Sequence, residues 1–135
     1  MSLKDIKDIL ANVAGGRCEY CKSLAKYATE SFCIDHILPK SKGGNDELTN
    51  LAYSCMGCNS RKYNKTEALD PVTGEKAPLF NPRNDNWNEN FVWSADSLKI
   101  LGISPMGRAT IEALKLNRKS LMNLRKLLVA SDEHP

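Results

Sequence analysis

Two short segments decide how this chain of 135 residues folds: Arg17-Cys18-Glu19-Tyr20-Cys21-Lys22 and Ser54-Cys55-Met56-Gly57-Cys58-Asn59. Each holds a Cys-x-x-Cys pair, which can form a tight knuckle that presents two thiolates to one tetrahedral ion at about 2.3 Å. Gly57 would suit the second knuckle, because such turns often need a positive φ. The alternatives are two unrelated pairs or a redox pair, but a redox pair explains only one of the two segments. The spacing therefore predicts a structural Zn²⁺ site with four ligands: Cys18, Cys21, Cys55 and Cys58.

Composition places the chain among ordinary globular proteins, with 41% hydrophobic and 26% charged residues. This length fits one domain, or one domain with a tail. No window approaches the roughly 20 apolar residues of a membrane span, and the first residues alternate charged with apolar side chains, unlike a signal peptide. We therefore expect a cytoplasmic protein in a reducing compartment, where a disulfide framework is disfavoured. The fifth cysteine, Cys33, lies in an apolar run and is expected to be buried as a small hydrophobe.

Charge is unevenly distributed along the chain. The net charge is +3, and the whole excess lies in residues 17–65, which hold eight basic and five acidic residues. The same stretch contains all five cysteines and His36. A second basic run lies between Arg108 and Lys126, with six basic residues and one Glu. The distribution favours a polyanionic partner more than the total does, although the second run can equally be the solvated face of a helix hairpin.

The pattern of apolar and turn-forming residues predicts a short series of elements around the two knuckles. A helix is expected over residues 3–13, where the apolar positions share one face and a glycine pair follows. Residues 30–38 read as a strand, residues 40–46 as a basic glycine-rich loop, and residues 51–54 as a second strand. A helix is expected over residues 58–69, before Pro71. The second knuckle then lies at the turn from strand to helix.

Polar side chains recur at the joints of this unit. Asp35 and His36 lie at the end of the first strand, Asn50 at the end of the loop, and Asn59 directly after the last cysteine. Carboxylate and carboxamide oxygens are hard ligands suited to Mg²⁺ or Mn²⁺, and a neutral imidazole can take a proton from water near pH 7. Taken singly, each residue has an ordinary structural interpretation as a turn acceptor, a helix cap or a core histidine. Taken together, they suffice for metal-assisted phosphodiester hydrolysis.

Residues 32–62 contain Asp-His-Ile-x-Pro, Gly-Gly, Asn-Leu and Cys-x-x-Cys-Asn in that order. This series resembles the HNH endonucleases, in the branch that has a four-cysteine zinc site around a ββα-metal core. The resemblance covers about residues 17–66 and implies an α+β fold. We expect an N-terminal helix in residues 1–16, the HNH nuclease core with its zinc site in residues 17–66, and an extension with short strands and two helices in residues 67–135.

The resemblance also implies a role for each polar residue. His36 matches the general base that activates water, and Asp35 matches a ligand of the catalytic divalent ion, Mg²⁺ or Mn²⁺. Asn50 matches the asparagine that braces the loop and orients His36 by hydrogen bonding, and Asn59 stands where the family has its second metal ligand. The implied activity is metal-dependent cleavage of DNA to 5′-phosphate and 3′-hydroxyl ends. The alternative is a zinc-ribbon module that binds nucleic acid without cutting it; a redox-regulated or purely structural zinc protein would leave these residues unexplained.

The implied partner is DNA, expected to be double-stranded, with no membrane association. Basic residues near the site are candidates for phosphate contacts, with a solvated surface as the alternative: Lys40, Lys42, Arg61, Lys62 and Lys65. Arg83, in the extension, is a further candidate for which a salt bridge is the alternative. The chain is expected to be a monomer, or a homodimer formed through the leucine stripe of residues 121–128.

The C-terminal half carries weaker signals. Short strands are expected at residues 77–80 and 91–94. Ser104-Pro105 predicts the start of a helix that runs to about residue 116, and Asn117 is expected to cap a second helix. The last six residues read as a frayed tail, so His134 is not a ligand candidate.

Overall fold

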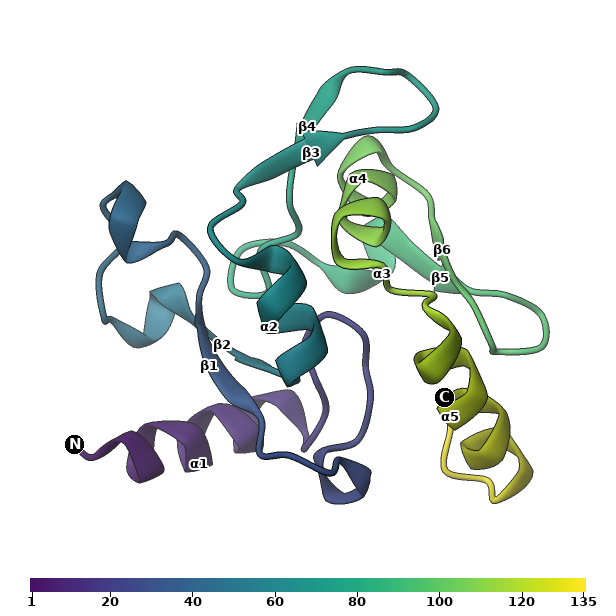
Figure 1. The fold of residues 1–135 in the computed structure, drawn as a ribbon, viewed down its shortest axis with the longest axis horizontal. Helices are drawn as coiled ribbons and strands as arrows, with labels where there is room; N and C mark the ends of the chain where they lie inside the picture. The colour runs from purple at the N-terminus through teal and green to yellow at the C-terminus, as the bar shows by residue number, and fades with distance from the viewer. The chain divides into compact units, whose positions relative to one another are not determined.

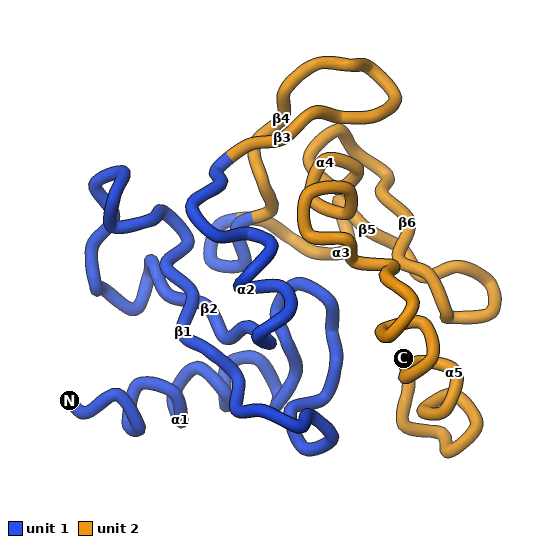
Figure 2. Tube along the Cα trace, in the orientation of Figure 1, with its two compact units in different colours: residues 1–66, 81–84 blue, residues 67–80, 85–135 orange.

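A computed structural model describes all 135 residues as helices and short strands, the strands forming three two-stranded sheets (Figure 1). The fold is α+β, as the sequence predicts. The chain divides into two compact units, one made of residues 1–66 and 81–84 and the other of residues 67–80 and 85–135 (Figure 2). None of the helices has the length and apolar character needed to cross a membrane.

Unit 1 contains a helix followed by a hairpin and a second helix. The first helix, α1 (Leu3–Ala14), begins with a capping box in which Ser2 and Asp5 satisfy each other's backbone N–H groups, and it ends at Gly15 with φ 62°. Strand β1 (Cys33–His36) pairs antiparallel with β2 (Leu51–Ser54), so that His36 lies opposite Leu51. Helix α2 (Met56–Lys62) follows β2 directly. Three short 3₁₀ turns complete the unit: Ala25–Tyr27, Lys40–Lys42 and Leu48–Asn50.

Helix α2 is shorter than the sequence predicts. It starts at Cys55, whose Sγ accepts a hydrogen bond from the N–H of Cys58, and it ends before Tyr63, where φ becomes 49°. The predicted helix over residues 58–69 is therefore wrong at both ends, and residues 67–69 form a strand instead. Gly57 lies inside the helix and does not supply a positive φ; Lys22, after the first knuckle, does so with φ 66°.

Unit 2 contains two hairpins and three helices. Strand β3 (Glu67–Leu69) pairs with β4 (Lys76–Pro78), and β5 (Phe91–Trp93) pairs with β6 (Ile100–Gly102). Helices α3 (Trp87–Asn90), α4 (Pro105–Leu114) and α5 (Lys119–Ala130) complete the unit. The strands predicted at residues 77–80 and 91–94 and the two C-terminal helices are present, with ends that shift by a few residues. Its buried core is largely aromatic and aliphatic: Leu79, Phe80, Phe91, Ile100, Leu114, Leu116, Leu121 and Leu128.

Two predictions for the end of the chain are wrong. Asn117 does not cap α5, because its side chain accepts from the N–H of Ile100 and donates to the carbonyl of the same residue; the helix begins after Arg118. The tail is not frayed, since His134 is only 8% exposed and its Nε2 lies 2.8 Å from the carbonyl oxygen of Ser97. The His134 ring also packs edge-on against Trp93, with 4.4 Å between the ring centroids.

The basic run between residues 108 and 126 does not form a continuous exposed stripe. The guanidinium of Arg108 makes two hydrogen bonds of 2.9 Å to the fully buried carboxylate of Asp70 and holds the pKa of that carboxyl below its usual range. Arg125 is 3% exposed and donates to the carbonyl oxygens of Leu98 and Leu116. Arg108 and Arg125 therefore form ion pairs or hydrogen bonds inside unit 2. The alternative that the basic run is a solvated helix face applies only to its other basic residues.

The loop between β1 and β2 is held closed by one side chain. Asn50 accepts from the N–H of Leu38 at 2.8 Å and donates to the carbonyls of Leu38 and Asn45. Gly44 passes so close to Leu38 that a Cβ at Gly44 would lie 1.7 Å from the Leu38 carbonyl oxygen. The loop therefore has one tight crossing, which only glycine permits.

We predict that Gly44→Ala destabilises unit 1 by about 3 kcal/mol, because the added methyl group collides with backbone that cannot move freely. Gly43→Ala is the matched control, since Gly43 has φ 92° but open space where a Cβ would be. Gly43→Ala should lower the free energy of unfolding by only about 1 kcal/mol, which is the cost of a left-handed backbone for a residue with a Cβ. Chemical denaturation followed by circular dichroism measures both values. Equal denaturation midpoints for the two variants would contradict the close approach of Gly44 to the Leu38 carbonyl oxygen.

Candidate functional site

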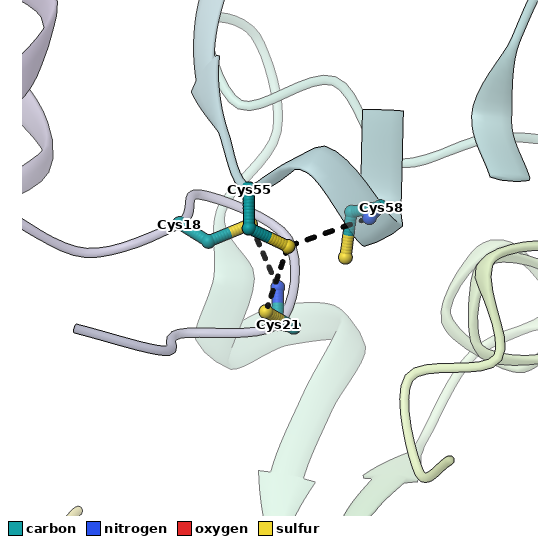
Figure 3. Close-up of side chains that lie close together, drawn as sticks. All are labelled: Cys18, Cys21, Cys55 and Cys58. Carbon is teal, nitrogen blue, oxygen red and sulfur yellow. Dashed lines mark hydrogen bonds between the residues drawn. The ribbon is translucent and has the colours of Figure 1, made fainter. Parts of the chain in front are cut away.

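Four cysteine side chains from the two knuckles converge in unit 1 (Figure 3). Their sulfur atoms all lie within 4.8 Å of one another, and those of Cys21 and Cys55 are 3.7 Å apart. A tetrahedral site with metal–sulfur bonds of about 2.3 Å has sulfur–sulfur edges of about 3.8 Å. Cys18, Cys21 and Cys58 are at most 1% exposed, and Cys55 is 9% exposed. The predicted convergence of the four cysteines on one site is confirmed, and a closed set of four thiolates fits Zn²⁺.

Charge within the cluster is unbalanced without a cation. Burial raises the pKa of the Cys18 thiol, whereas hydrogen bonds from the thiols of Cys18, Cys21 and Cys58 lower the pKa of Cys55. Four buried sulfur atoms this close cannot all be thiolates unless a positive charge lies between them. A divalent ion supplies that charge, so the chemistry of the donor set also fits a metal.

The fifth cysteine takes no part in this cluster. Cys33 is half-buried and borders a shallow surface pocket together with Leu3 and Ile34. The prediction that Cys33 is buried as a small hydrophobe holds only in part. Cys33 is the first residue of β1 and borders a surface pocket that residues of α1 also line.

Asp35 is the centre of a buried ionic group. It is 3% exposed, its Oδ2 accepts a 2.6 Å hydrogen bond from the hydroxyl of Tyr20, and the Nζ of Lys62 lies 3.2–3.3 Å from its two oxygens. Burial raises the pKa of Asp35, although Lys62 and Tyr20 oppose that shift. Lys62, itself 1% exposed, also donates to the carbonyls of His36 and Ile37 at 3.1 and 3.0 Å.

The two residues that hold Asp35 come from the two metal-binding segments. Tyr20 lies between Cys18 and Cys21, and Lys62 ends the helix that begins at the second knuckle. The cluster therefore fixes the elements that carry both partners of the carboxylate.

A pocket of about 440 Å³ lies beside β1 and the end of α2. It brings together three of the four residues predicted for catalysis and metal binding, Asp35, His36 and Asn59. The side chain of Asn59 makes no hydrogen bond within the chain, so its carboxamide oxygen is available to a ligand. A carboxylate oxygen and a free carboxamide oxygen at one pocket are a donor set that fits Mg²⁺ or Mn²⁺. The remaining residues that border the pocket are Ile34, Pro39, Lys40, Ser41, Tyr63 and Asn64.

Asn50 lies outside this pocket. All of its hydrogen bonds go to the backbone of the β1–β2 loop, at Leu38 and Asn45. It therefore braces the loop, as expected, but no hydrogen bond joins it to His36.

The partner of His36 is a residue that the sequence did not indicate. The Nε2 of His36 lies 2.8 Å from Oδ1 of Asp46, and the other oxygen of Asp46 accepts from Lys40 at 3.0 Å. Both contacts hold the pKa of Asp46 below its usual range, His36 having the larger effect. An ionised carboxylate can only accept a hydrogen bond, so Nε2 carries a proton in this contact and Nδ1 is the remaining ring nitrogen that can act as a base. One sequence feature could have indicated the contact between His36 and Asp46. Asp46 follows shortly after the Gly43-Gly44 pair, which lets the loop turn back toward β1.

Two predicted phosphate contacts are wrong. Lys62 is inside the protein, paired with Asp35, and does not present its ammonium group to a ligand. Arg83 forms a two-bond salt bridge to Glu19, at 2.6 and 2.8 Å, and its Nε donates to the carbonyl of Leu51. For Arg83 the salt-bridge alternative is correct. Both partners lie far away in the sequence, so local charge patterns could not reveal them.

The other four basic candidates are exposed. Lys40 borders the pocket and pairs with Asp46, and Lys42 follows it in the loop. Arg61 and Lys65 fold back onto carbonyl oxygens, those of Gly57 and Arg61 respectively. Their contact with phosphate stays a prediction.

An antiparallel hairpin followed by a helix, with a four-cysteine cluster at the strand-to-helix turn, defines a metal-binding ββα domain. Residues 18–65 match the family model described as HNH endonuclease, so this part of the chain is similar to that family. The match supports nuclease activity and a nucleic-acid substrate at the level of the family. Comparisons with curated proteins and with solved structures give no match.

We predict that Lys62→Met destabilises the protein by about 3–5 kcal/mol, because it leaves the buried carboxylate of Asp35 without its cation. The double variant Lys62→Met/Asp35→Asn should recover most of that loss, since no charge is then left uncompensated. Lys42→Met is the control, at an exposed lysine of the loop. Denaturation midpoints measure all three, and equal midpoints for Lys62→Met and Lys42→Met would show that Lys62 is a surface residue.

A second prediction concerns the sulfur cluster. Cys58→Ser should lower the bound zinc to well below one ion per chain and reduce the thermal stability, because metal binding at such a site contributes directly to folding. Cys33→Ser, at the cysteine outside the cluster, should keep the zinc. Metal analysis and thermal melting of both purified variants check this. A zinc-free Cys58→Ser protein that melts like the parent would refute a structural role.

Proposed function

We propose that this protein is a metal-dependent endonuclease that hydrolyses DNA phosphodiester bonds and leaves 5′-phosphate and 3′-hydroxyl ends. The observation that supports it most is the pocket itself. Within the segment that matches the HNH endonucleases, an imidazole and a carboxylate from consecutive residues of β1 border one cavity together with a free carboxamide from α2. A module that only binds nucleic acid needs none of these three groups.

In this proposal His36 is the general base. Its Nδ1 takes a proton from the water that attacks phosphorus, and the ring becomes an imidazolium. Asp46 stabilises that imidazolium through the 2.8 Å contact at Nε2 and fixes the ring orientation. Asp46 therefore acts as a positioning residue, through His36 and without touching the substrate.

Asp35 and Asn59 would hold the divalent ion, which when bound supplies positive charge for the phosphate and the leaving 3′-oxygen. Lys62 and Tyr20 keep the Asp35 carboxylate in one orientation at the wall of the pocket. Two protein ligands are few, which fits an ion that retains several waters and binds firmly together with substrate phosphate. Lys40, Lys42, Arg61 and Lys65 would contact backbone phosphates on either side of the cut.

The test is cleavage of plasmid DNA in Mg²⁺ or Mn²⁺. His36→Ala should lower the rate by about 10²–10⁴-fold, which is the contribution of a general base. Asp46→Asn should lower the rate by about tenfold, since it removes only the stabilising charge and keeps the ring and the shape of the loop. His134→Ala, in unit 2, is the control for loss of a histidine elsewhere in the chain.

Two outcomes would contradict the proposal. If His36→Ala cuts at the parent rate, the assignment of the base is wrong. If the parent binds DNA and cuts none of the substrates in either metal, the non-catalytic zinc-ribbon module is the better description. Zinc content is measured alongside, so that a lost cluster is not mistaken for a lost base.

A further inference from the structure

The backbone at Tyr63 has a conformation that suits glycine. Helix α2 ends there with φ 49° and ψ −112°, while the Tyr63 N–H still donates to the carbonyl of Asn59 at 2.9 Å. Residues with a Cβ rarely adopt a positive φ, and this ψ lies outside the usual left-handed helical region as well. A glycine would end the helix at this point without strain.

The side chain of Tyr63 gains nothing from the protein that would offset this strain. It is 75% exposed, and neither its hydroxyl group nor its ring has a hydrogen bond or a ring contact in the structure. The strain therefore persists without a hydrogen bond or ring contact to explain a tyrosine here. Backbone strain that internal contacts do not explain is typical of functional positions.

Tyr63 lies where a ligand of the proposed nuclease would be. It borders the same pocket as Asp35, His36 and Asn59. Arg61 precedes it and Lys65 follows it, and both are exposed. An exposed aromatic ring with cations two positions before and after it in the sequence is a combination that suits binding of single-stranded nucleic acid, where bases stack on rings and phosphates meet positive charge.

We propose that Tyr63 stacks on the base of a nucleotide next to the phosphate that is cut, an inference that rests on the proposed function. Inside a paired duplex both faces of a base are covered by its neighbours. Stacking on Tyr63 therefore needs a nucleotide whose base is out of the helix. The preferred substrate class is DNA with unpaired nucleotides at the cleavage point, such as a bubble within a duplex, rather than uninterrupted duplex.

Cleavage by Tyr63 variants tests this inference. Tyr63→Gly removes the ring and the strain together, so we expect a higher melting temperature and a kcat/KM on bubble DNA lower by about 10–100-fold, the loss typical of one stacked base. Tyr63→Phe keeps the ring and should stay within about threefold of the parent, since the stacking surface is unchanged. Tyr27→Ala, at another exposed tyrosine of unit 1 that does not border the pocket, is the matched control.

The inference is overturned if Tyr63→Gly cuts bubble DNA as fast as the parent, or if the parent cuts uninterrupted duplex as fast as bubble DNA. A rise in melting temperature with loss of cleavage supports it strongly, because misfolding would lower both. A loss in Tyr63→Phe equal to that in Tyr63→Gly also overturns it, because the hydroxyl group and not the ring would then be the contact.

A binding measurement separates this inference from the proposed function. An oligonucleotide with 2-aminopurine at the unpaired position is titrated with zinc-loaded protein without added Mg²⁺ or Mn²⁺, so no cleavage is required. The parent and Tyr63→Phe should quench the fluorescence, and Tyr63→Gly should not. Quenching by a protein that cuts no DNA would uphold the stacking role and refute the nuclease. Cleavage without Tyr63-dependent quenching would uphold the nuclease and refute the stacking role.

Discussion

Four sulfur atoms within 4.8 Å of one another are the constraint on which the rest of unit 1 depends. Four buried thiolates at this distance are stable only around a cation, so the two knuckles are poised to bind a metal that would join them. The apolar core of unit 1 is modest, with Leu10, Phe32 and Leu51 among its buried side chains. A metal bound there would contribute substantially to the folding free energy and would tie the hairpin and α2 together.

The two cysteine knuckles also determine the surroundings of Asp35, which borders the pocket. One knuckle contributes Tyr20 and the helix that follows the other contributes Lys62, and both hold the same carboxylate. Because side chains alternate along a strand, Asp35 faces inward and its neighbour His36 faces the loop. The two residues therefore lie in different environments, one desolvated and paired with a lysine, the other half-exposed and paired with Asp46.

Local chemistry explains which features were predictable from the sequence. The four cysteines follow from spacing alone, and the strand at residues 51–54 from a short run of apolar residues before the second knuckle. Lys62 was misplaced because a lysine near a helix end normally reaches solvent, and only tertiary contacts show that this one is buried. The sequence could not decide between a phosphate contact and a salt bridge for Arg83, because its partner Glu19 lies 64 positions away. The end of α2 was missed because Tyr63 carries no sequence signal for a helix stop, whereas a glycine would have.

The contact of Arg83 with Glu19 also shows how far unit 1 extends along the chain. Residues 81–84 belong to unit 1, although the chain has already entered unit 2 at residue 67. The domain is thus discontinuous, and the matched segment of residues 18–65 lacks one of its own buried ion-pair partners. A fragment that stops at residue 66 leaves the carboxylate of Glu19, 7% exposed, without its guanidinium. Residues 67–80 therefore interrupt unit 1 in the sequence, and exchange of unit 2 for another module would need three junctions, at residues 66/67, 80/81 and 84/85.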